Sequence, residues 1–441
     1  MSHRVRHAVT PAYLLLCLLL GGSVQAVWGN LVLQLIGLGI VAWSFWSVEK
    51  PALSRSARTL GRFAVATVLL MLIQLIPLPP ALWTMLPGRQ IAIEGYDLLG
   101  EPLPWLPLSL TPYESLASLP PLIPPLAIVA AILRQGAYRS SWLAIAIVAG
   151  ALSSIMLGAL QATTGHFYLY PYSSIGSATG FFANGNFLGT LLLATVAYLA
   201  ALACGRHGTD RPAGLIAIGP LLVVMVGLVI SRSLAALLLT LPVALASLLL
   251  FSAGQGRTQR WMAWVALGAG VLALFAFTRL PALTDPNNAA STATRTLIYR
   301  TTSSAIAENL PFGSGSGSFA RIYALHERPD EFQGAYVNHA HNDYLEVALE
   351  LGVPGVILLA LFLWWWGARA LTIWRSRANS AFARAATIAS ATILAHSLID
   401  FPVRNAAIAG VFAASVGFMA EPRRHRAESL PQDRPARHLT L

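Results

Sequence analysis

The residues best suited to chemistry gather in one short segment, Asn338–Glu346. It holds two histidines, two asparagines, an aspartate and a glutamate. A histidine titrates near neutral pH and can remove a proton from a hydroxyl nucleophile. His341 or His339 is therefore a candidate general base. The alternative is a purely structural role as a helix N-cap, in which Asn342 or the aspartate after it caps a helix that begins near Tyr344.

The spacing His339-x-His341-x-Asp343 also copies the start of a metallo-β-lactamase-type metal motif. That motif continues with another histidine, but position 344 of this chain is a tyrosine. Two histidines without a third ligand do not close a zinc site. The sequence therefore predicts no metal at this segment, and nothing in it calls for a cofactor.

Arginines form a second group of candidates. Arg232 stands between two apolar runs, Arg295 and Arg300 lie in a helix predicted over 294–308, and Arg404 opens the last apolar run. An arginine binds phosphate oxygens through two nitrogens and stays charged. The group predicts a site for a lipid-linked phosphate or pyrophosphate. The alternative is that these side chains extend from helix ends into water.

Other polar segments leave two interpretations open. Asn184 and Asn186 precede an apolar run, and they either cap its helix or bind sugar hydroxyls. Asp400 is a further candidate, although it can simply neutralise Arg404, four residues later. The glycine–serine run 313–319 is expected to be a flexible link after a helix, with a backbone cradle for phosphate as the alternative.

The composition indicates what class of protein carries these residues. Of 441 residues, 56% are hydrophobic and only 11% are charged, and the mean hydropathy is +0.63. A soluble domain carries about 25% charged residues, so a soluble enzyme, a disordered chain and a disulfide scaffold are excluded. The remaining class is an all-α polytopic membrane protein. Cys17 and Cys204 lie in apolar runs and are expected to be small buried hydrophobic residues.

Apolar runs predict about twelve transmembrane helices in one domain over 1–421, followed by a disordered, basic cytoplasmic tail over 422–441. No internal repeat is visible. The predicted spans are 11–28, 31–48, 60–78, 116–134, 142–161, 186–204, 214–231, 233–252, 262–278, 346–366, 384–400 and 404–421.

Charge then predicts the topology. With a cytoplasmic N-terminus, 21 of the 29 lysines and arginines fall in inside segments, as the positive-inside rule requires. The net charge of +11 is thus explained without nucleic acid. Two long outside loops remain, about 79–115 and 279–345, and the second, between spans nine and ten, is expected to pack on the helices as a lid. Residues 1–28 also resemble a signal peptide, so cleavage after residue 26 is an alternative.

Six segments, in order within residues 170–420, together resemble the O-antigen ligase and polymerase superfamily of membrane glycosyltransferases (WaaL-like and Wzy-like). This sequence departs from the family pattern at Val356, where a small residue or tyrosine is common, and at Ser177-Ala178, where a basic residue is common. The six segments are Gly180-x-Phe182-x-Asn184-x-Asn186-x-Leu188, Ser231-Arg232-Ser233, Arg295-Thr-Leu-Ile-Tyr299, Pro311-Phe-Gly313-Ser-Gly315-x-Gly317-x-Phe319, His341-Asn342 with Gly352, and His396-Ser-Leu-x-Asp400-Phe-Pro402.

The resemblance implies a reaction and a place. A glycan carried on undecaprenyl pyrophosphate is transferred, with inversion, to an acceptor hydroxyl at the periplasmic side of a bacterial inner membrane, without metal or nucleotide. The family's His–Asn pair falls at His341-Asn342, which implies His341 as the base. Arg232 and Arg295 match the pyrophosphate-binding positions. The lesser candidates are Arg300 and Arg404 for pyrophosphate, and Asn184, Asn186, His339, Asn342 and Asp400 for other substrate contacts.

Several functions stay open at this point. The acceptor is lipid A core in a ligase, a second lipid-linked repeat in a polymerase, or a protein hydroxyl in a protein glycosyltransferase. A transporter or lipid flippase is the alternative from another class, and a scaffold is a third. A transporter predicts ionisable groups in mid-span and often repeated halves. Here the charges lie at span ends, which favours the glycosyltransferase.

Overall fold

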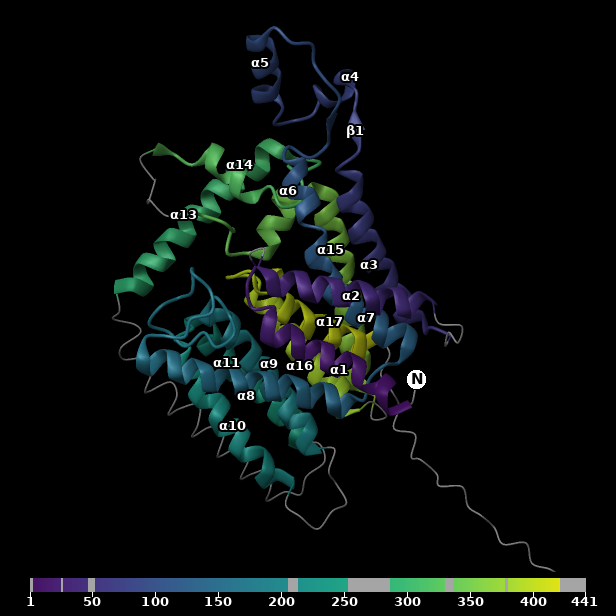
Figure 1. Cartoon of the computed structure of the whole chain (residues 1–441), viewed down its shortest axis with the longest axis vertical. Helices are drawn as coiled ribbons and strands as arrows, with labels where there is room; N and C mark the ends of the chain where they lie inside the picture. The colour runs from purple at the N-terminus through teal and green to yellow at the C-terminus, as the bar shows by residue number, and fades with distance from the viewer. Residues whose placement is uncertain are drawn as a thin grey trace, which may run out of the picture.

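A computed structural model describes residues 3–24, 27–46, 52–204, 213–252, 286–329, 336–376 and 380–420 (Figure 1). Within these ranges the fold is helical apart from one short antiparallel strand pair, which confirms the all-α prediction. The elements are α1 (His3–Leu20), α2 (Trp28–Trp46), α3 (Arg55–Ile73), β1 (Pro77–Leu78), α4 (Pro80–Trp83), α5 (Gln90–Leu99), β2 (Leu106–Pro107), α6 (Pro112–Ala117), η1 (Pro120–Leu122), α7 (Ile123–Gln135), α8 (Ser140–Thr164), α9 (Gly185–Cys204), α10 (Ala213–Ile230), α11 (Leu234–Ser252), α13 (Pro286–Asn309), α14 (Phe319–His326), α15 (Asp343–Arg375), α16 (Ala381–His396), η3 (Pro402–Arg404) and α17 (Ala406–Ala420).

The predicted number of about twelve spans is confirmed only in part. Seven described helices are long and apolar enough to cross a membrane, and Gly219–Ile230 and Ala406–Ala420 are shorter apolar helices. The predicted span 262–278 and the tail 422–441 lie outside the described residues. The seven are Trp28–Trp46, Arg55–Ile73, Pro112–Gln135, Ser140–Thr164, Gly185–Cys204, Leu234–Phe251 and Asp343–Arg375.

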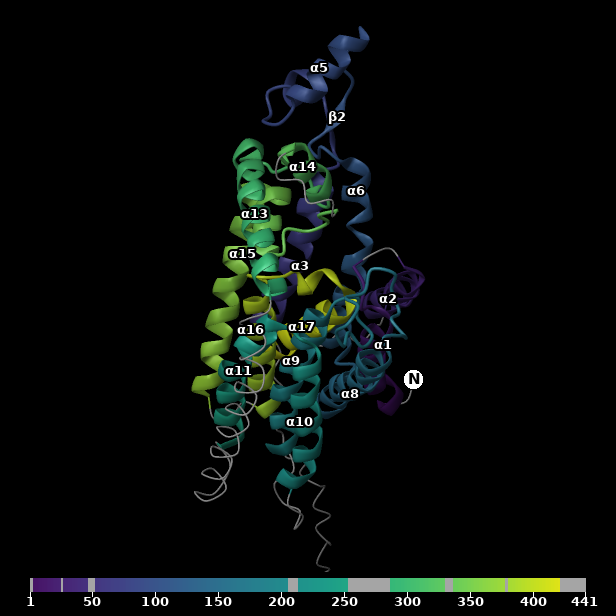
Figure 2. The ribbon, with the colours of Figure 1, turned by 90° about the vertical axis from the view of Figure 1, so that its left-hand side faces the viewer.

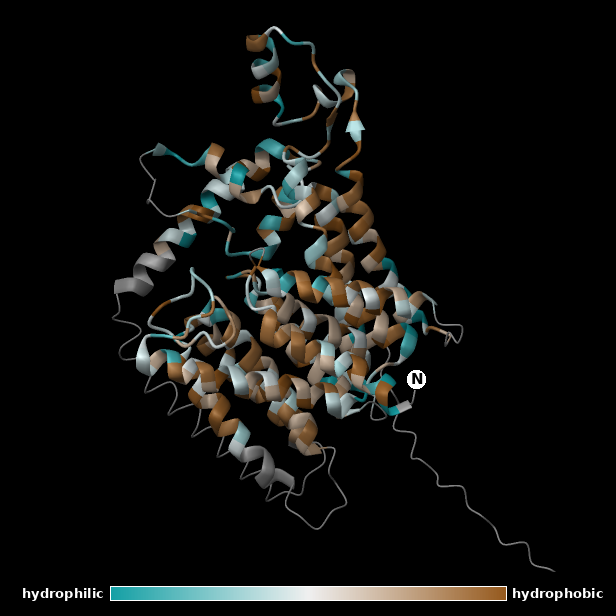
Figure 3. Cartoon of the chain, in the orientation of Figure 1, coloured by the Kyte–Doolittle hydropathy of each residue, from teal (hydrophilic) through white to brown (hydrophobic). Residues whose placement is uncertain are grey.

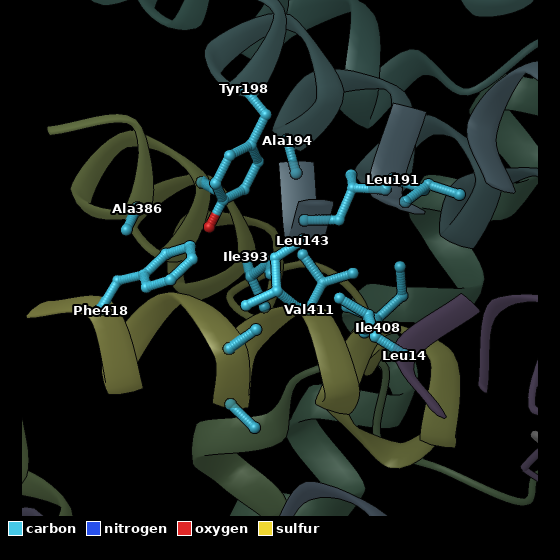
Figure 4. Close-up of a cluster of buried hydrophobic side chains, with 14 of the residues drawn as sticks. Leu14, Leu143, Leu191, Ala194, Tyr198, Ala386, Ile393, Ile408, Val411 and Phe418 are labelled. Atoms are coloured by element: carbon cyan, nitrogen blue, oxygen red, sulfur yellow. The ribbon is translucent and has the colours of Figure 1, made fainter. Parts of the chain in front are cut away.

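Small residues build the centre of the bundle. α9 packs against α16, and α16 packs against α17, and alanine and glycine on these helices let the backbones approach closely. Figure 4 shows the interlocking side chains, with Tyr198 beside Phe418. The Tyr198 hydroxyl lies 2.8 Å from the Ser415 hydroxyl, so its polar atom is satisfied. Of the two cysteines, Cys17 is fully buried, as the sequence predicts, whereas Cys204 is only half-buried.

Apolar residues cover most of the bundle helices, as Figure 3 shows. Hydrogen bonds join helix ends that the topology places on the same side. Arg6 Nε donates to the Gln135 carbonyl at 2.8 Å, between two segments predicted inside. Ala178 N donates to the Ile230 carbonyl at 3.1 Å, between a segment predicted outside and the outer end of the predicted span 214–231. Each contact joins two helix ends at the same side of the bundle.

The two long predicted outside loops fold differently. Residues 77–107 project beyond the bundle and are closed by the pairing of β1 with β2 (Figures 1 and 2). Within them the fully buried Trp83 donates from Nε1 to the Pro104 carbonyl at 2.8 Å. In the second loop, α13 is longer than the predicted helix 294–308. α13 and α14 pack on the start of α15 through a small apolar cluster that includes Ile298, Phe319 and Leu349.

The glycine–serine run is not a flexible link, so that prediction is wrong. Residues 311–318, which we call the strap, include Ser314, Ser316 and Ser318, all of which are buried. Ser314 N donates to the Leu349 carbonyl at 2.8 Å, and Gly315 N donates to the Glu350 carbonyl at 2.9 Å. The strap is therefore fastened along α15.

A break in α15 explains why the strap lies there. Gly352 has φ 59° and ψ −153°, which interrupts the helix, and Pro354 has no N–H to offer the carbonyl of Glu350. The strap supplies the missing partners, since Val353 N also donates to the Pro311 carbonyl at 2.8 Å. Broken backbone at membrane depth is tolerated where protein buries and pairs it.

The side chain of Gln74, just after α3, completes this joint. Its Nε2 donates to the Glu350 carbonyl at 2.8 Å, and its Oε1 accepts from Ser316 N at 3.0 Å. The N–H groups of Ser314, Gly315 and Ser316 are thus all used within the protein. The alternative of a phosphate cradle in the strap is not supported either.

Candidate active site

His341 and Asp400 form the central pair of the site. His341 lies two residues before α15, and Asp400 lies in the turn after α16. His341 Nδ1 is 3.2 Å from Asp400 Oδ1, and the two side chains are 27% and 0% exposed. A buried carboxylate needs hydrogen-bond donors. Asn186 Nδ2 donates to Oδ2 at 2.6 Å, and Phe401 N donates to Oδ1 at 3.0 Å.

This arrangement sets the chemistry of the imidazole. Asp400 can only accept a hydrogen bond when ionised, so it favours the tautomer of His341 with the proton on Nδ1. The other nitrogen, Nε2, then carries the lone pair. A buried carboxylate that orients a half-exposed histidine in this way suits a general base, because it also stabilises the imidazolium formed after proton transfer.

The backbone at His341 is held in an uncommon conformation. Its φ is +51°, in the left-handed region that side chains with a Cβ seldom adopt. Tyr299 of α13 donates from its hydroxyl to the His341 carbonyl at 2.9 Å. The neighbouring Asn342 caps α15, because its Oδ1 accepts from Tyr344 N at 3.0 Å and from Leu345 N at 3.1 Å. The predicted cap is confirmed, and it ties the base to a helix start.

Arg295 lies near this pair. It is half-buried on α13, one turn before Tyr299. Burial raises the pKa of the Tyr299 phenol, while the positive charge of Arg295 lowers it and the negative charge of Asp400 raises it further. The contact that ties α13 to the site is the Tyr299 hydroxyl on the His341 carbonyl, and Arg295 lies one turn from it.

Arg404, which the sequence gives as a lesser candidate for pyrophosphate, is paired with carboxylates of this chain. Its guanidinium lies 3.2 Å from Glu350 Oε2, 3.5 Å from Asp343 Oδ1 and 3.6 Å from Glu346 Oε2. The three carboxylates are buried on one face of α15. The structure does not show the alternative in which Asp400 neutralises Arg404, because Asp400 pairs with His341 instead. The positive charge of Arg404 is balanced by this chain's own acids.

His339 belongs to a second imidazole–carboxylate pair. Its Nδ1 is 2.8 Å from Oε1 of the fully buried Glu346. The rings of His339 and His341 both pack on Phe401, with centroid separations of 4.2 and 4.9 Å. The structure thus brings both histidines of the sequence motif to one aromatic ring, but it links them to different carboxylates.

The remaining sequence candidates separate into two groups. Asn184 accepts from Asn186 N at 2.9 Å and so caps α9, as one alternative holds. Arg232 is exposed, with φ +53°, in the turn between α10 and α11. This turn touches the start of α9, where a Cβ added at Gly185 would lie 2.6 Å from the Ser231 carbonyl oxygen. Arg300 is exposed on α13. The structure therefore places Arg232 near the Asn186 end of the site.

Sequence reasoning missed several contributors. Thr190 Oγ1 lies 2.6 Å from Nδ1 of the fully buried His396, which fastens α16 to α9 beside the site. The pairing of Arg404 with Asp343, Glu346 and Glu350 was also missed. A signal existed for that pairing, since three acids at intervals of three and four residues share one face of an otherwise apolar helix.

The described ranges contain no group of three or more histidine, cysteine, aspartate or glutamate side chains that could hold a metal ion. No curated protein matches the chain at a significant level. The O-antigen ligase family model, Wzy_C, matches residues 219–360. This stretch includes Arg232, Arg295, the strap and His341. The family match therefore supports the resemblance of this chain, over residues 219–360, to the O-antigen ligase and Wzy-type polymerase superfamily.

Proposed function

We propose that this membrane protein is an O-antigen ligase, which transfers a glycan from undecaprenyl pyrophosphate to a hydroxyl of lipid A core. The reaction takes place at the periplasmic face of the bacterial inner membrane, inverts the anomeric carbon and uses no metal. Both termini lie in the cytoplasm. The family match and the multi-pass helical fold support this class of reaction.

The observation that carries the proposal is the His341–Asp400 pair, with its carboxylate fully buried and its imidazole 27% exposed. His341 Nε2 removes the proton of the acceptor hydroxyl as its oxygen attacks the anomeric carbon. Asp400 stabilises the imidazolium that results. The bond between the anomeric carbon and the pyrophosphate oxygen breaks in the same step, and pyrophosphate leaves on its lipid.

Arginines meet the charge of the leaving group. We assign this role to Arg232 and Arg295, since a fixed guanidinium stabilises charge that develops on phosphate oxygens. Arg300 is a lesser candidate on the exposed side of α13. We assign Arg404 a structural role, because removing it would leave three buried carboxylates without a cation.

A polymerase of the same superfamily is the second candidate, since it uses the same donor and differs only in the acceptor. A transporter or lipid flippase remains the candidate from another class. Glu346 and Glu350 lie buried within the candidate span Asp343–Arg375, which a transporter would use. Both glutamates are paired with Arg404 inside the protein, and this favours the transferase.

The test uses a deletion strain that carries wild type, His341→Ala or His326→Ala. His326 is a matched control, because it contacts Glu308 at the end of α13 and lies outside the site. Lipopolysaccharide is separated by length on a gel, and lipid-linked glycan is extracted in parallel. We expect wild type and His326→Ala to restore the ladder, and His341→Ala to leave bare core with accumulated lipid-linked polymer.

The outcomes separate the candidates. Wild-type ladders with His341→Ala at equal expression would contradict the proposed base. Single repeats on core without long chains would identify a polymerase. If the deletion changes neither lipopolysaccharide nor secreted polysaccharide, the glycan function fails and transport is the next assay.

A further inference from the structure

Three non-glycine residues in the described part of the chain have positive φ: Arg232, His341 and Phe167, at 53°, 51° and 67°. Such backbone is strained and persists where its surroundings enforce it, often at functional sites. Two of the three belong to the proposed site. Phe167 has no role yet, although its ring is 58% exposed. It lies in the loop 165–183 between α8 and α9.

The loop 165–183 is fastened at its base by one side chain. Gln161, at the end of α8, is fully buried. Its Nε2 donates to the carbonyls of Phe167 at 3.1 Å and Gly180 at 3.0 Å. Its Oε1 accepts from Thr179 N at 3.0 Å and Gly180 N at 2.8 Å. Both ends of the loop are thus joined, so its exposed surface is preformed.

The loop turns aromatic residues outward although other aromatics hold it together. Tyr168 has an internal role, because its hydroxyl accepts from Gly176 N at 2.9 Å. Tyr170 is partly buried, which raises the pKa of its phenol. Tyr172 and Ile175, in contrast, are each 77% exposed. Between residues 165 and 186 there is no aspartate, glutamate, lysine or arginine, and the exposed His166 is the one histidine. The loop is therefore aromatic, rich in hydroxyls and without acidic side chains.

The base of this loop adjoins the proposed site. Ala178 N donates to the Ile230 carbonyl at 3.1 Å, next to the turn that holds Arg232. The loop ends at Asn184, and the next polar side chain, Asn186, donates to Asp400. The base of the loop therefore contacts the segment that leads to Arg232, and the loop is followed by the asparagine that binds Asp400.

We propose that Phe167 and Tyr172 form a binding surface for the sugar units of the lipid-linked donor. This inference rests on the proposed function. Sugar rings are uncharged and present apolar C–H faces, which pack on aromatic rings, while their hydroxyls bond to neutral polar groups. The charged pyrophosphate is met by arginines, and the sugar units beyond it extend over the aromatic, hydroxyl-rich loop.

The experiment uses the full-length protein in nanodiscs and two probes. One is undecaprenyl pyrophosphate carrying the glycan, extracted from the deletion strain, and the other is undecaprenyl pyrophosphate alone as a competitor. The variants are Tyr172→Ala and Phe167→Gly, which also relieves the positive φ. Tyr113→Ala is the matched control, since Tyr113 is 85% exposed on α6, outside the loop.

We expect each loop variant to raise the KM for the glycan donor about three- to tenfold, equivalent to about 0.7–1.4 kcal/mol, with kcat close to wild type. The inhibition constant of undecaprenyl pyrophosphate alone stays unchanged, and Tyr113→Ala behaves as wild type. Unchanged KM in both loop variants overturns the inference. An equal loss of affinity for both probes also overturns it, because the aromatics then contact lipid or anchor the loop in the membrane interface.

Failure of the proposed function is seen elsewhere in the same data. If wild type itself transfers no glycan, the proposed function fails and the assignment of a sugar ligand fails with it. If wild type transfers glycan and both loop variants have the same KM as wild type, the function stands and the proposed binding surface is wrong.

Discussion

Replacing the carboxylate of the central pair tests the mechanism most directly. In Asp400→Asn the side chain keeps its shape, and its remaining oxygen can face His341 and Phe401 N. The new amide then faces Asn186, 2.6 Å away in the native structure, which can accept by turning its own amide over. The variant is therefore expected to fold, and its defect should lie in the charge.

The size of that defect follows from the geometry. At 3.2 Å and an effective dielectric constant of about 20, a carboxylate and an imidazolium attract each other by about 5 kcal/mol. A neutral amide that keeps one hydrogen bond retains about 1 kcal/mol. The difference of about 4 kcal/mol acts only after His341 has taken the proton. It corresponds to a loss of about a thousandfold in kcat.

The assay is transfer by purified protein from lipid-linked glycan to lipid A core, with kcat and KM measured separately. We expect KM to change little, because the attraction is absent before proton transfer. Asp97→Asn on the exposed face of α5 is the matched control. A kcat for Asp400→Asn within about threefold of wild type, with an unchanged melting temperature, would refute the role of the buried carboxylate.

Three further predictions follow from the packing. Asn186→Ala should lower kcat about tenfold with little change in KM, because it removes one hydrogen bond from the Asp400 carboxylate. An unchanged kcat would contradict this. Gly352→Ala should lower the melting temperature, because its φ is +59° and a Cβ would lie 2.3 Å from a strap carbonyl oxygen. Gly367→Ala, with open space at that position, should not. Arg404→Ala should destabilise the protein by about 3–5 kcal/mol by leaving buried carboxylates unpaired, whereas Arg321→Ala, which breaks an exposed pair, should cost under about 1 kcal/mol. Equal melting temperatures for these two arginine variants would contradict the assigned role.

Local patterns in the sequence predicted the structural features that depend on neighbouring residues. Hydropathy predicted the helical membrane fold, and the polar residue before an apolar run predicted the cap at Asn342. The sequence predicted a helix that ends at residue 308, and α13 ends at Asn309. Each of these features depends on residues within a few positions of one another.

Contacts between distant segments could not be found in the same way. Asp400 is 59 residues from His341, and the periodicity of neither segment shows that they meet. The strap looked flexible because glycine and serine usually signal a loop. It is ordered because α15 is broken at Gly352, a partner that lies further along the chain. The sequence predicted Arg404 as a candidate for binding pyrophosphate, whereas the structure pairs it with carboxylates of α15.

The joint made by Gln74 has a consequence for how the protein is synthesised. Its two hydrogen-bond partners lie 242 and 276 residues later in the chain. At about 5–20 residues per second, translation needs about 10–50 s to reach the first of them. During that time the amide must be satisfied by water or by a transient partner. Segments made late in synthesis thus supply the hydrogen-bond partners of a helix end made early. A chain that stalls before residue 316 leaves the Gln74 amide without these partners, and a membrane quality-control protease can recognise such an exposed polar group.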